Sequence, residues 1–292
     1  MKMCTKLLTV HMFKDVAKKD LVSKCPLYPN RYDGNKSMIW AKNDMNERVG
    51  IVDQIMVLKN SNPGIGLHAR NATMGEEYAM VEQFIDYYCS KFIHNNKKHR
   101  LAVFVEPRID SGFPDVVFAS YRPSILENWS DERSKLDVSD FKLLSFLCYT
   151  PNATGDIIIS KLGLPERQTL KSLEKLLDAK LIVHRNMCWQ ARNIRDIFSI
   201  TKLVAVEAKM SNVSKVVEQS FLNTWFASHS YAVTNSVNPH NDTIQSFSQC
   251  GVGLYCRGKQ FKKVVDAKQY SLPSSYLSFQ FNEWIGRTLA MA

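Results

Sequence analysis

The stretches PDVVFAS (residues 114–120) and TKLVAVEAKM (residues 201–210) decide the fold of this chain. Each combines an apolar, β-prone run with charged groups at one end. Glu207 and Lys209 are two residues apart, so an extended strand turns both side chains to the same face. Asp115 begins the other strand, and pairing of the two strands would place its carboxylate beside that of Glu207. The sequence therefore predicts a cluster of charges at adjacent strand ends.

Two converging carboxylates form a site for a hard, oxygen-binding cation such as Mg²⁺, with Mn²⁺ as a substitute. Such a cation polarises a phosphoryl oxygen and lowers the pKa of bound water. Lys209 would then position the water or offset the negative charge of the transition state. The residues alone leave an alternative open, in which Glu207 and Lys209 are an exposed edge pair and Asp115 is an ordinary turn residue after proline.

The neighbouring segments predict alternating helices and strands. Gly75 precedes an amphipathic helix over residues 76–92, in which apolar side chains recur at spacings of three and four. The fully apolar run 101–105 predicts a strand that is buried on both faces and forms a hairpin with residues 114–120. The elements expected after the second stretch are a helix over 213–227 and strands over 231–234 and 251–257.

This order of elements resembles the PD-(D/E)XK nuclease superfamily, which has the restriction-endonuclease-like fold. The matching residues are Pro114-Asp115 and Glu207-Ala208-Lys209. The resemblance implies an α/β fold with a mixed central sheet flanked by helices, and a magnesium-dependent endonuclease activity. It also implies metal binding by Asp115, Glu207 and the carbonyl of Ala208, with Lys209 assisting the attacking water.

Two further residues match positions of that family. Glu77, on the helix before the first strand, resembles an extra acidic residue that many members carry there, and Glu76 and Glu82 are rivals for this role. Gln219, ten residues after Lys209, resembles a glutamine found at that place in several branches. A solvent-exposed helix residue is the alternative for Gln219.

Asp115 and Glu207 are farther apart in the sequence than the corresponding residues of the family, so residues 129–195 are predicted to be an insertion. Helices are expected over 139–149, with Ser139 or Asp140 near the cap, and over 154–162. Pro165 opens a third helix over 166–180. Two short strands, 181–183 and 187–190, would flank a tight basic turn at 184–186. This pattern resembles a winged helix-turn-helix.

The third helix of the insert is the candidate for reading DNA. Leu170, Leu173 and Leu177 are expected to form its core stripe, with Ser172 on another face. The candidate nucleic-acid-binding residues are Arg167, Gln168, Lys171 and Lys175 on the helix and Arg185 at the turn. Such side chains contact phosphates and base edges in the major groove. A protein-contact module is the alternative.

The chain thus divides into four predicted segments. Residues 1–75 are an extension of unclear role, with a short helix over 7–22 and strands over 37–41 and 49–58. Residues 76–128 form the first half of the nuclease core, 129–195 the winged-helix-like insert, and 196–292 the second half with an aromatic-rich tail.

Composition favours a polyanionic partner. The formal net charge is +10 and the pI about 9.2, which points to nucleic acid first and acidic membrane surfaces second, with a merely basic soluble protein as the alternative. The expected nucleic acid is DNA, with RNA left open. A C-terminal basic cluster of Arg257, Lys259, Lys262, Lys263 and Lys268 is either a solvated face or a phosphate track. Because double-strand cutters often work in pairs, a homodimer is a further expectation.

Targeting signals and cysteine usage predict an intracellular, cytoplasmic protein. The apolar run near the N-terminus is too short for a signal peptide, and no run reaches a membrane span. The seven cysteines form no C-x-x-C pair, which favours reduced thiols. Two rival functions remain at this stage: a nucleic-acid binder without catalysis, and a structural or interaction protein that keeps the fold without the chemistry.

Overall fold

The computed structural model describes residues 40–42, 48–50, 54–59, 63–69, 74–109, 112 and 114–291. The helix predicted over residues 7–22 lies outside them. β1 (Trp40–Lys42) and β2 (Arg48–Gly50) form a small antiparallel pair. The strand predicted over residues 49–58 is divided between β2 and β3 (Ile55–Leu58).

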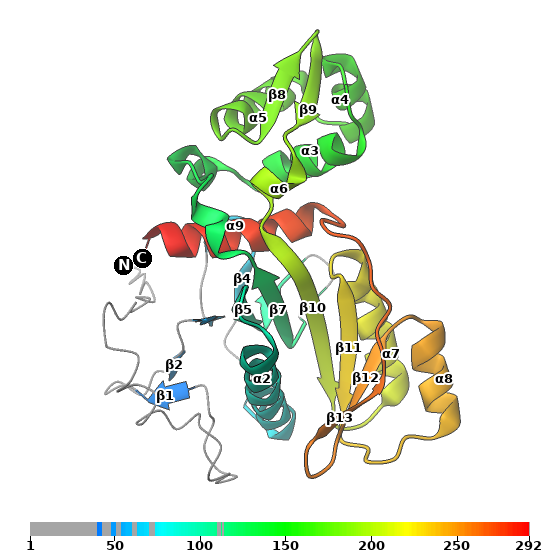
Figure 1. Ribbon diagram of the computed structural model, residues 1–292. Helices are drawn as coiled ribbons and strands as arrows, with labels where there is room; N and C mark the ends of the chain where they lie inside the picture. The colour runs from blue at the N-terminus through cyan, green and yellow to red at the C-terminus, as the bar shows by residue number, and fades with distance from the viewer. Residues whose placement is uncertain are drawn as a thin grey trace, which may run out of the picture.

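A seven-stranded sheet forms the centre of the molecule (Figure 1). Its strands, in spatial order, are β13 (Phe261–Val265), β12 (Gly253–Arg257), β11 (His229–Thr234), β10 (Ile200–Lys209), β7 (Val116–Tyr121), β5 (Arg100–Val105) and β3. β10, β11 and β12 are parallel, whereas β7 runs antiparallel to both β10 and β5. The predicted α/β class with a mixed sheet is confirmed. Because β3 belongs to it, the sheet begins before residue 76, the expected start of the core.

Helices flank the sheet because its central strands are apolar on both faces. α2 (Glu76–Asn95) covers one face, where Phe84 packs with Val204 and Val206 of β10. The opposite face is covered by α7 (Val213–Leu222), α8 (Asn241–Gln249) and α9 (Tyr276–Met291). Leu203 and Ala205 of β10 point to that side. Side chains of β10 therefore alternate between the two layers, which fixes the face on which each charged residue appears.

The predicted insert forms the lobe above α9 in Figure 1. After η1 (Pro123–Leu126), its elements are η2 (Asp131–Lys135), α3 (Val138–Tyr149), α4 (Gly155–Leu162), α5 (Glu166–Asp178), β8 (Ile182–Arg185), β9 (Cys188–Ala191) and α6 (Ile194–Ile197). The predicted order of three helices and two strands is present. Asp137, rather than Ser139 or Asp140, caps α3, and Asp140 completes its capping box. The turn falls at Asn186 and Met187, one to two residues later than expected, and both have positive φ.

The leucine stripe predicted on α5 is wrong in part. Leu173 is buried, but Leu170 and Leu177 are 51% and 42% exposed. The buried face consists of Thr169, Ser172, Leu173 and Leu176. Thr169 tolerates burial because its hydroxyl donates to the carbonyl of Pro165 at 3.2 Å. The buried face of α5 therefore includes the small polar side chains of Thr169 and Ser172. Leu170 and Leu177, which were predicted to lie there, are exposed.

α9 is the element between the sheet and the insert, which gives a role to the C-terminal tail. Every residue from Leu277 to Arg287 is buried. Phe281 and Trp284 pack on Phe104 of β5, with ring centroids 4.9 Å apart in both cases. Insert residues such as Phe141 belong to the same apolar cluster. The sheet and the insert therefore share one core, with α9 at its centre.

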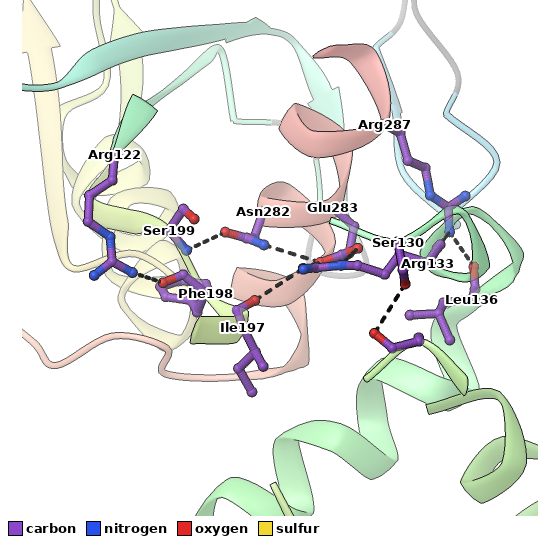
Figure 2. A network of polar contacts seen from close by, with 11 residues as sticks. Arg122, Ser130, Arg133, Leu136, Ile197, Phe198, Ser199, Asn282, Glu283 and Arg287 are labelled. Atoms are coloured by element: carbon purple, nitrogen blue, oxygen red, sulfur yellow. Dashed lines mark hydrogen bonds and ion pairs between the residues drawn. The ribbon is translucent and has the colours of Figure 1, made fainter. Parts of the chain in front are cut away.

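A buried polar network secures this junction (Figure 2). Arg133 of η2 forms a two-bond ion pair with Glu283 of α9, both 2% exposed or less. Arg287 donates to the carbonyl of Leu136 at 2.6 Å. Asn282 accepts a 2.8 Å hydrogen bond from the N–H of Ser199, at the entrance to β10. The polar side chains of α9 therefore find partners on both sides of the insert, although Arg287 Nε has none among the described residues.

Two smaller features complete the described part of the chain. β4 (His68–Ala69) pairs antiparallel with β6 (Pro107–Arg108), beside the turn that joins β5 to β7. Among the described helices, none is both long and apolar enough to cross a membrane.

Candidate active site

Asp115 and Glu207 lie side by side where the β7–β10 ladder ends. Its final pair is Val116 opposite Val206, so Asp115 and Glu207 continue the same row. Asp115 Oδ2 accepts a 2.7 Å hydrogen bond from the N–H of Ala208. Val116, Val206 and Ala208 all pack on the α2 side of the sheet. The alternation of β10 therefore turns Glu207 away from the Val206 and Ala208 side, and Asp115, one residue before β7, meets β10 at the end of the ladder.

Glu207 is held in place by an amide from the next helical segment. Its side chain is 4% exposed, and Asn223 Nδ2 donates to its Oε1 at 2.8 Å. Asn223 begins η3 (Asn223–Trp225), the 3-10 turn into which α7 passes at Leu222, five residues before the predicted helix end. We did not predict this contact from the sequence. The sequence offered one clue to this contact. Asn223 lies one helical turn after Gln219, so both residues fall on the same face of a helix.

Burial raises the pKa of both carboxylates. For Asp115, burial outweighs the hydrogen bond from Ala208 and the charge of Lys209, and its pKa reaches about 6. For Glu207, burial and then the charge of Asp115 outweigh the hydrogen bond from Asn223, and its pKa reaches about 8. Burial therefore favours the protonated form of Glu207, and a bound cation would displace that proton.

Lys209 brings a positive charge to this acidic site and is anchored by α2. Its Nζ forms an ion pair with Glu77, which lies in the first turn of α2. Burial disfavours the charged lysine, but the hydrogen bond to Glu77 and the charge of Asp115 leave its pKa raised. Glu76 is exposed, and Glu82 pairs with Lys59 at 3.8 Å. Of the three acidic residues considered on this helix, Glu77 is the one that contacts the site.

Glu106 is a third buried carboxylate that the sequence reasoning missed. It follows the last residue of β5, and its N–H donates to the carbonyl of Asp115 at 2.9 Å. Its charge raises the pKa of Asp115. The backbone of Glu106 has φ 46°, a left-handed conformation that is uncommon for a residue with a side chain. The signal available in the sequence was an acidic residue directly after an apolar run. Glu106, Asp115 and Glu207 thus form an acidic row across three strand ends.

Gln219 lies on α7, one turn before Asn223. Its amide oxygen is buried and has no hydrogen-bond donor among the residues that the structure describes. An unsatisfied buried oxygen of this kind favours a polar ligand from outside the chain, such as a hydrated cation. The structure thus places the amide oxygen of Gln219 in the interior, unlike a solvent-exposed helix residue.

The oxygen atoms at the site fit Mg²⁺. Asp115 Oδ1 and Glu207 Oε2 remain after the bonds from Ala208 and Asn223. The carbonyl of Ala208 points to the same side as its N–H, since both groups of a residue in an antiparallel strand face one neighbour. Within the described ranges, no three His, Cys, Asp or Glu side chains stand close enough to hold a metal by themselves. Two carboxylates, a carbonyl and solvent are nevertheless a set that Mg²⁺ accepts.

The residues proposed to bind nucleic acid fall into two groups. Arg167, Gln168 and Lys171 on α5 and Arg185 at the end of β8 are exposed, although Gln168 Nε2 donates to Ser139 Oγ at 3.1 Å. Lys175 is different, because its Nζ pairs with Asp137 at 2.8 Å and with Asp140 at 2.9 Å. In this structure Lys175 therefore fastens α5 to the start of α3, and its role in nucleic-acid binding stays a prediction.

Comparison with known proteins leaves the family of this chain open. No protein-family profile matches it, and no curated protein matches it. Among solved structures, it is similar to the crystal structure of protein VC1899 from Vibrio cholerae, with 11% identity over 71% of this chain and 74% of that chain. The TM-score of 0.16 is too low to relate the two folds.

Proposed function

We propose that this chain is a metal-dependent nuclease that hydrolyses phosphodiester bonds, with DNA as the substrate and a restriction-endonuclease-like core. The observation that carries the proposal is the convergence of Asp115, Glu207, Lys209 and Glu77 at one end of β10. The chain order α2, β5, β7, β10 and α7 supports the same core. Rows of buried carboxylates beside a lysine are costly for stability, which favours a functional origin.

Each residue of this site has a distinct part in the proposed hydrolysis. Asp115, Glu207 and the carbonyl of Ala208 would hold Mg²⁺ or Mn²⁺. That ion supplies Lewis acidity toward a phosphoryl oxygen and a lower pKa for attacking water. Lys209, oriented by Glu77, places a positive charge beside the phosphate and offsets the negative charge of the transition state.

Asn223 and Glu106 support these groups from outside the metal ligands. The amide of Asn223 fixes one oxygen of Glu207, so that the other oxygen faces the site. The N–H of Glu106 holds the backbone of Asp115 where β7 begins. Gln219 offers a buried amide oxygen at the same end of α7. These contacts keep the carboxylates in place before any ligand arrives.

The insert would supply the contact to DNA, as a winged-helix-like module. Arg167, Gln168 and Lys171 lie exposed on the N-terminal half of α5, and Arg185 lies exposed beside the β8–β9 turn. Arginine and glutamine contact base edges, and lysine contacts phosphates. The net charge of +10 strengthens the attraction to a polyanion. α9 connects this module rigidly to the sheet that carries the acidic row.

Cleavage of supercoiled plasmid with Mg²⁺ or Mn²⁺ tests the activity directly. The comparison is wild type against Asp115→Asn and Lys209→Met, with exposed Asp131→Asn as the matched control. We expect nicking by wild type and Asp131→Asn, and none by the two site variants or in EDTA. A folded RNA in place of plasmid tests the alternative substrate. Equal cleavage by all four proteins would contradict the assignment of Asp115 and Lys209 to the active site.

A second candidate is a nucleic-acid binder without catalysis, and the exposed cations of the insert favour it. Such a protein binds DNA equally well in EDTA and after Asp115→Asn, and wild type cuts neither DNA nor RNA. A gel-shift titration beside the cleavage assay separates the two functions. Sedimentation with and without DNA tests the predicted homodimer, which would let two sites cut both strands.

A further inference from the structure

A cavity that does not include the acidic row lies where α7, α8 and the segment after β13 meet. It has a volume of about 570 Å³, and its lining includes Phe221, Gln249, Gly251, Asp266, Lys268 and Tyr270. A backbone hydrogen bond joins two of its parts, since the N–H of Lys268 donates to the carbonyl of Gly251 at 2.9 Å. Figure 1 shows the chain running past α8 on its way from β13 to α9. Three separate segments of the chain therefore build this cavity.

Gly251 lets two lining side chains approach the backbone just after α8. Its φ is +67°, the left-handed conformation that favours glycine beyond the end of a helix. A Cβ at this position would lie 3.1 Å from Lys268 Cβ and 3.1 Å from Tyr270 Oη. The positions of Lys268 and Tyr270 in the lining therefore depend on the absence of a side chain at residue 251.

Two aromatic rings contribute to the lining. The side chain of Phe221 is 51% exposed, and within the described part of the chain it packs against no other aromatic ring. Tyr270 is partly buried, and Lys268 Nζ lies over its ring, 5.4 Å from the centroid. Every nucleobase has a flat π-face that stacks on such rings, whatever its sequence context. The exposed ring of Phe221 beside a cavity therefore favours a flat, aromatic ligand.

Polar groups of the lining match the edge of a nucleobase. The side-chain amide of Gln249 and the hydroxyl of Tyr270 form no hydrogen bond with any residue that the structure describes, and both can donate and accept. Gln249 is also the last residue of α8, where the negative end of the helix dipole attracts an amino group. The lining therefore offers both kinds of hydrogen-bonding group that the amino, carbonyl and ring-nitrogen atoms of a base require.

Lys268 provides positive charge for a phosphate attached to the base. It forms no ion pair in the described part of the chain, whereas the charge of Asp266 is offset by its ion pair with Lys263. Lysine contacts phosphates without regard to base sequence. The cavity therefore combines an aromatic surface, a polar edge and a cation, the three kinds of contact that a nucleotide makes.

We propose that this cavity binds an unpaired nucleobase, which stacks on Phe221 while Lys268 contacts its phosphate. A base within a duplex is covered by its neighbours, so the ligand is a base in a single-stranded segment or in a free nucleotide. Asn223, two residues after Phe221, holds Glu207, so α7 connects this cavity with the acidic row. The inference rests on the proposed contact with nucleic acid and adds a single-stranded segment to it, but it does not depend on hydrolysis.

The test measures binding of two short, end-labelled probes to the full chain in EDTA. The first probe is a strand whose only base is a central 2-aminopurine, which changes its fluorescence on stacking. The second probe is the same strand without any base. Wild type should bind the first probe about tenfold more tightly than the second, with a saturable change in 2-aminopurine fluorescence.

Three variants connect this difference to the lining. Phe221→Ala should bind the two probes equally and should abolish the change in 2-aminopurine fluorescence. Leu222→Ala is the matched control, because Leu222 is 48% exposed at the next position and is not part of the lining. Lys268→Met should weaken the binding of both probes and keep their ratio, since it removes a phosphate contact.

Displacement of the first probe distinguishes the two sources of the base. If deoxyadenosine monophosphate displaces it as well as an unlabelled single strand does, the cavity binds free nucleotides, and displacement by the strand alone assigns it to single-stranded nucleic acid. Equal affinity of wild type for the two probes overturns the inference. Equal losses in Phe221→Ala and Leu222→Ala also overturn it. Plasmid cleavage measured beside these assays shows whether the proposed function stands when the inference fails.

Discussion

Asp115 Oδ2 accepts its hydrogen bond from the main chain of Ala208, the residue between the two charged members of the Glu-x-Lys motif. The carboxylate of Asp115, one residue before β7, is therefore held by the backbone of β10. A backbone donor cannot swing away as a side chain can, so the separation between the two carboxylates follows from the register of the sheet. The acidic row is consequently as rigid as the ladder beneath it.

Replacing Glu207 by glutamine should stabilise the protein in a pH-dependent way. The unfolded chain releases this proton near pH 4.5, whereas the folded chain keeps it until about pH 8. The folded state binds more protons across this interval, so wild-type stability falls as pH rises through it. The gain for Glu207→Gln should be absent below the interval and on the order of 5 kcal/mol above it.

Urea unfolding at roughly pH 5 and roughly pH 9 measures this gain. Glu174→Gln is the matched control, because Glu174 is exposed on α5. A gain of the same size at both pH values would contradict the assigned protonation of Glu207.

Magnesium should stabilise wild type and not Asp115→Asn. Cation binding to the folded state adds free energy that grows with ligand concentration, and for a chain of this size millimolar Mg²⁺ should raise Tm by about 2–4 °C. Asparagine keeps an oxygen for the Ala208 hydrogen bond but removes the charge. A thermal scan with and without Mg²⁺ measures the shift, with Asp131→Asn as control. Identical shifts in all three proteins would place the ion elsewhere.

Glu77→Gln should slow cleavage without unfolding the protein. Glu77 orients Lys209 through their ion pair, and loss of such a supporting partner typically costs about 10–100-fold in activity. Glu76→Gln, one residue away and exposed, should cleave at the wild-type rate. Single-turnover cleavage with saturating Mg²⁺ separates this effect from metal affinity. If Glu76→Gln slows cleavage as much as Glu77→Gln does, Lys209 is not positioned by Glu77.

Removing one partner of the buried ion pair at α9 should destabilise the whole chain. Arg133→Ala leaves Glu283 charged and buried, which costs about 3–5 kcal/mol. Lys135→Ala, which breaks the exposed pair with Glu132, should cost at most about 1 kcal/mol. Chemical unfolding monitored by tryptophan fluorescence and by circular dichroism compares the two. If the insert unfolds at a lower denaturant concentration than the sheet, the two parts do not share a core.

Two lysines on α5 should differ in their effect: Lys171 should contribute to DNA binding, and Lys175 should contribute to stability. Lys171→Ala should weaken DNA binding and reduce the slope of log affinity against log salt by about one, as expected for one phosphate contact. Lys175→Ala should mainly lower stability, because it leaves Asp140 buried without its partner. Lys97→Ala, exposed in the loop after α2, is the charge-matched control. Fluorescence anisotropy over a salt series gives the slopes, and equal slopes for Lys171→Ala and Lys97→Ala would remove α5 from the interface.

Elements with strong local patterns were predictable from the sequence. The alternation in residues 201–210 and the apolar stripe of α2 gave the correct types and nearly the correct bounds. The meeting of Asp115 with Glu207 also followed, because adjacent apolar strands that end in charge have few ways to pair. The positions of Asn223 and Glu106 in the site could not be predicted. That of Asn223 depends on where α7 ends, and that of Glu106 depends on a left-handed backbone just after β5.

The burial of α9 was the feature of the fold that the sequence predicted least well. Gln280, Asn282, Glu283 and Arg287 make its sequence look too polar for the interior. Their partners, such as Ile65 and Arg133, are far away in the chain. Burial of such a helix depends on contacts that no local pattern encodes. The same reason explains the error on α5, where Thr169 and Ser172 lie beneath the helix.

The position of α9 has a consequence for synthesis of the protein on the ribosome. Residues 276–291 emerge after every other described element, yet Phe104 of β5 and Phe141 of the insert share the cluster that α9 completes. A nascent chain therefore carries the finished acidic row while its central apolar surface is still uncovered. The sheet and the insert therefore reach their final packing only after residues 276–291 have been synthesised. Until then, its exposed apolar surface makes it a client for chaperones.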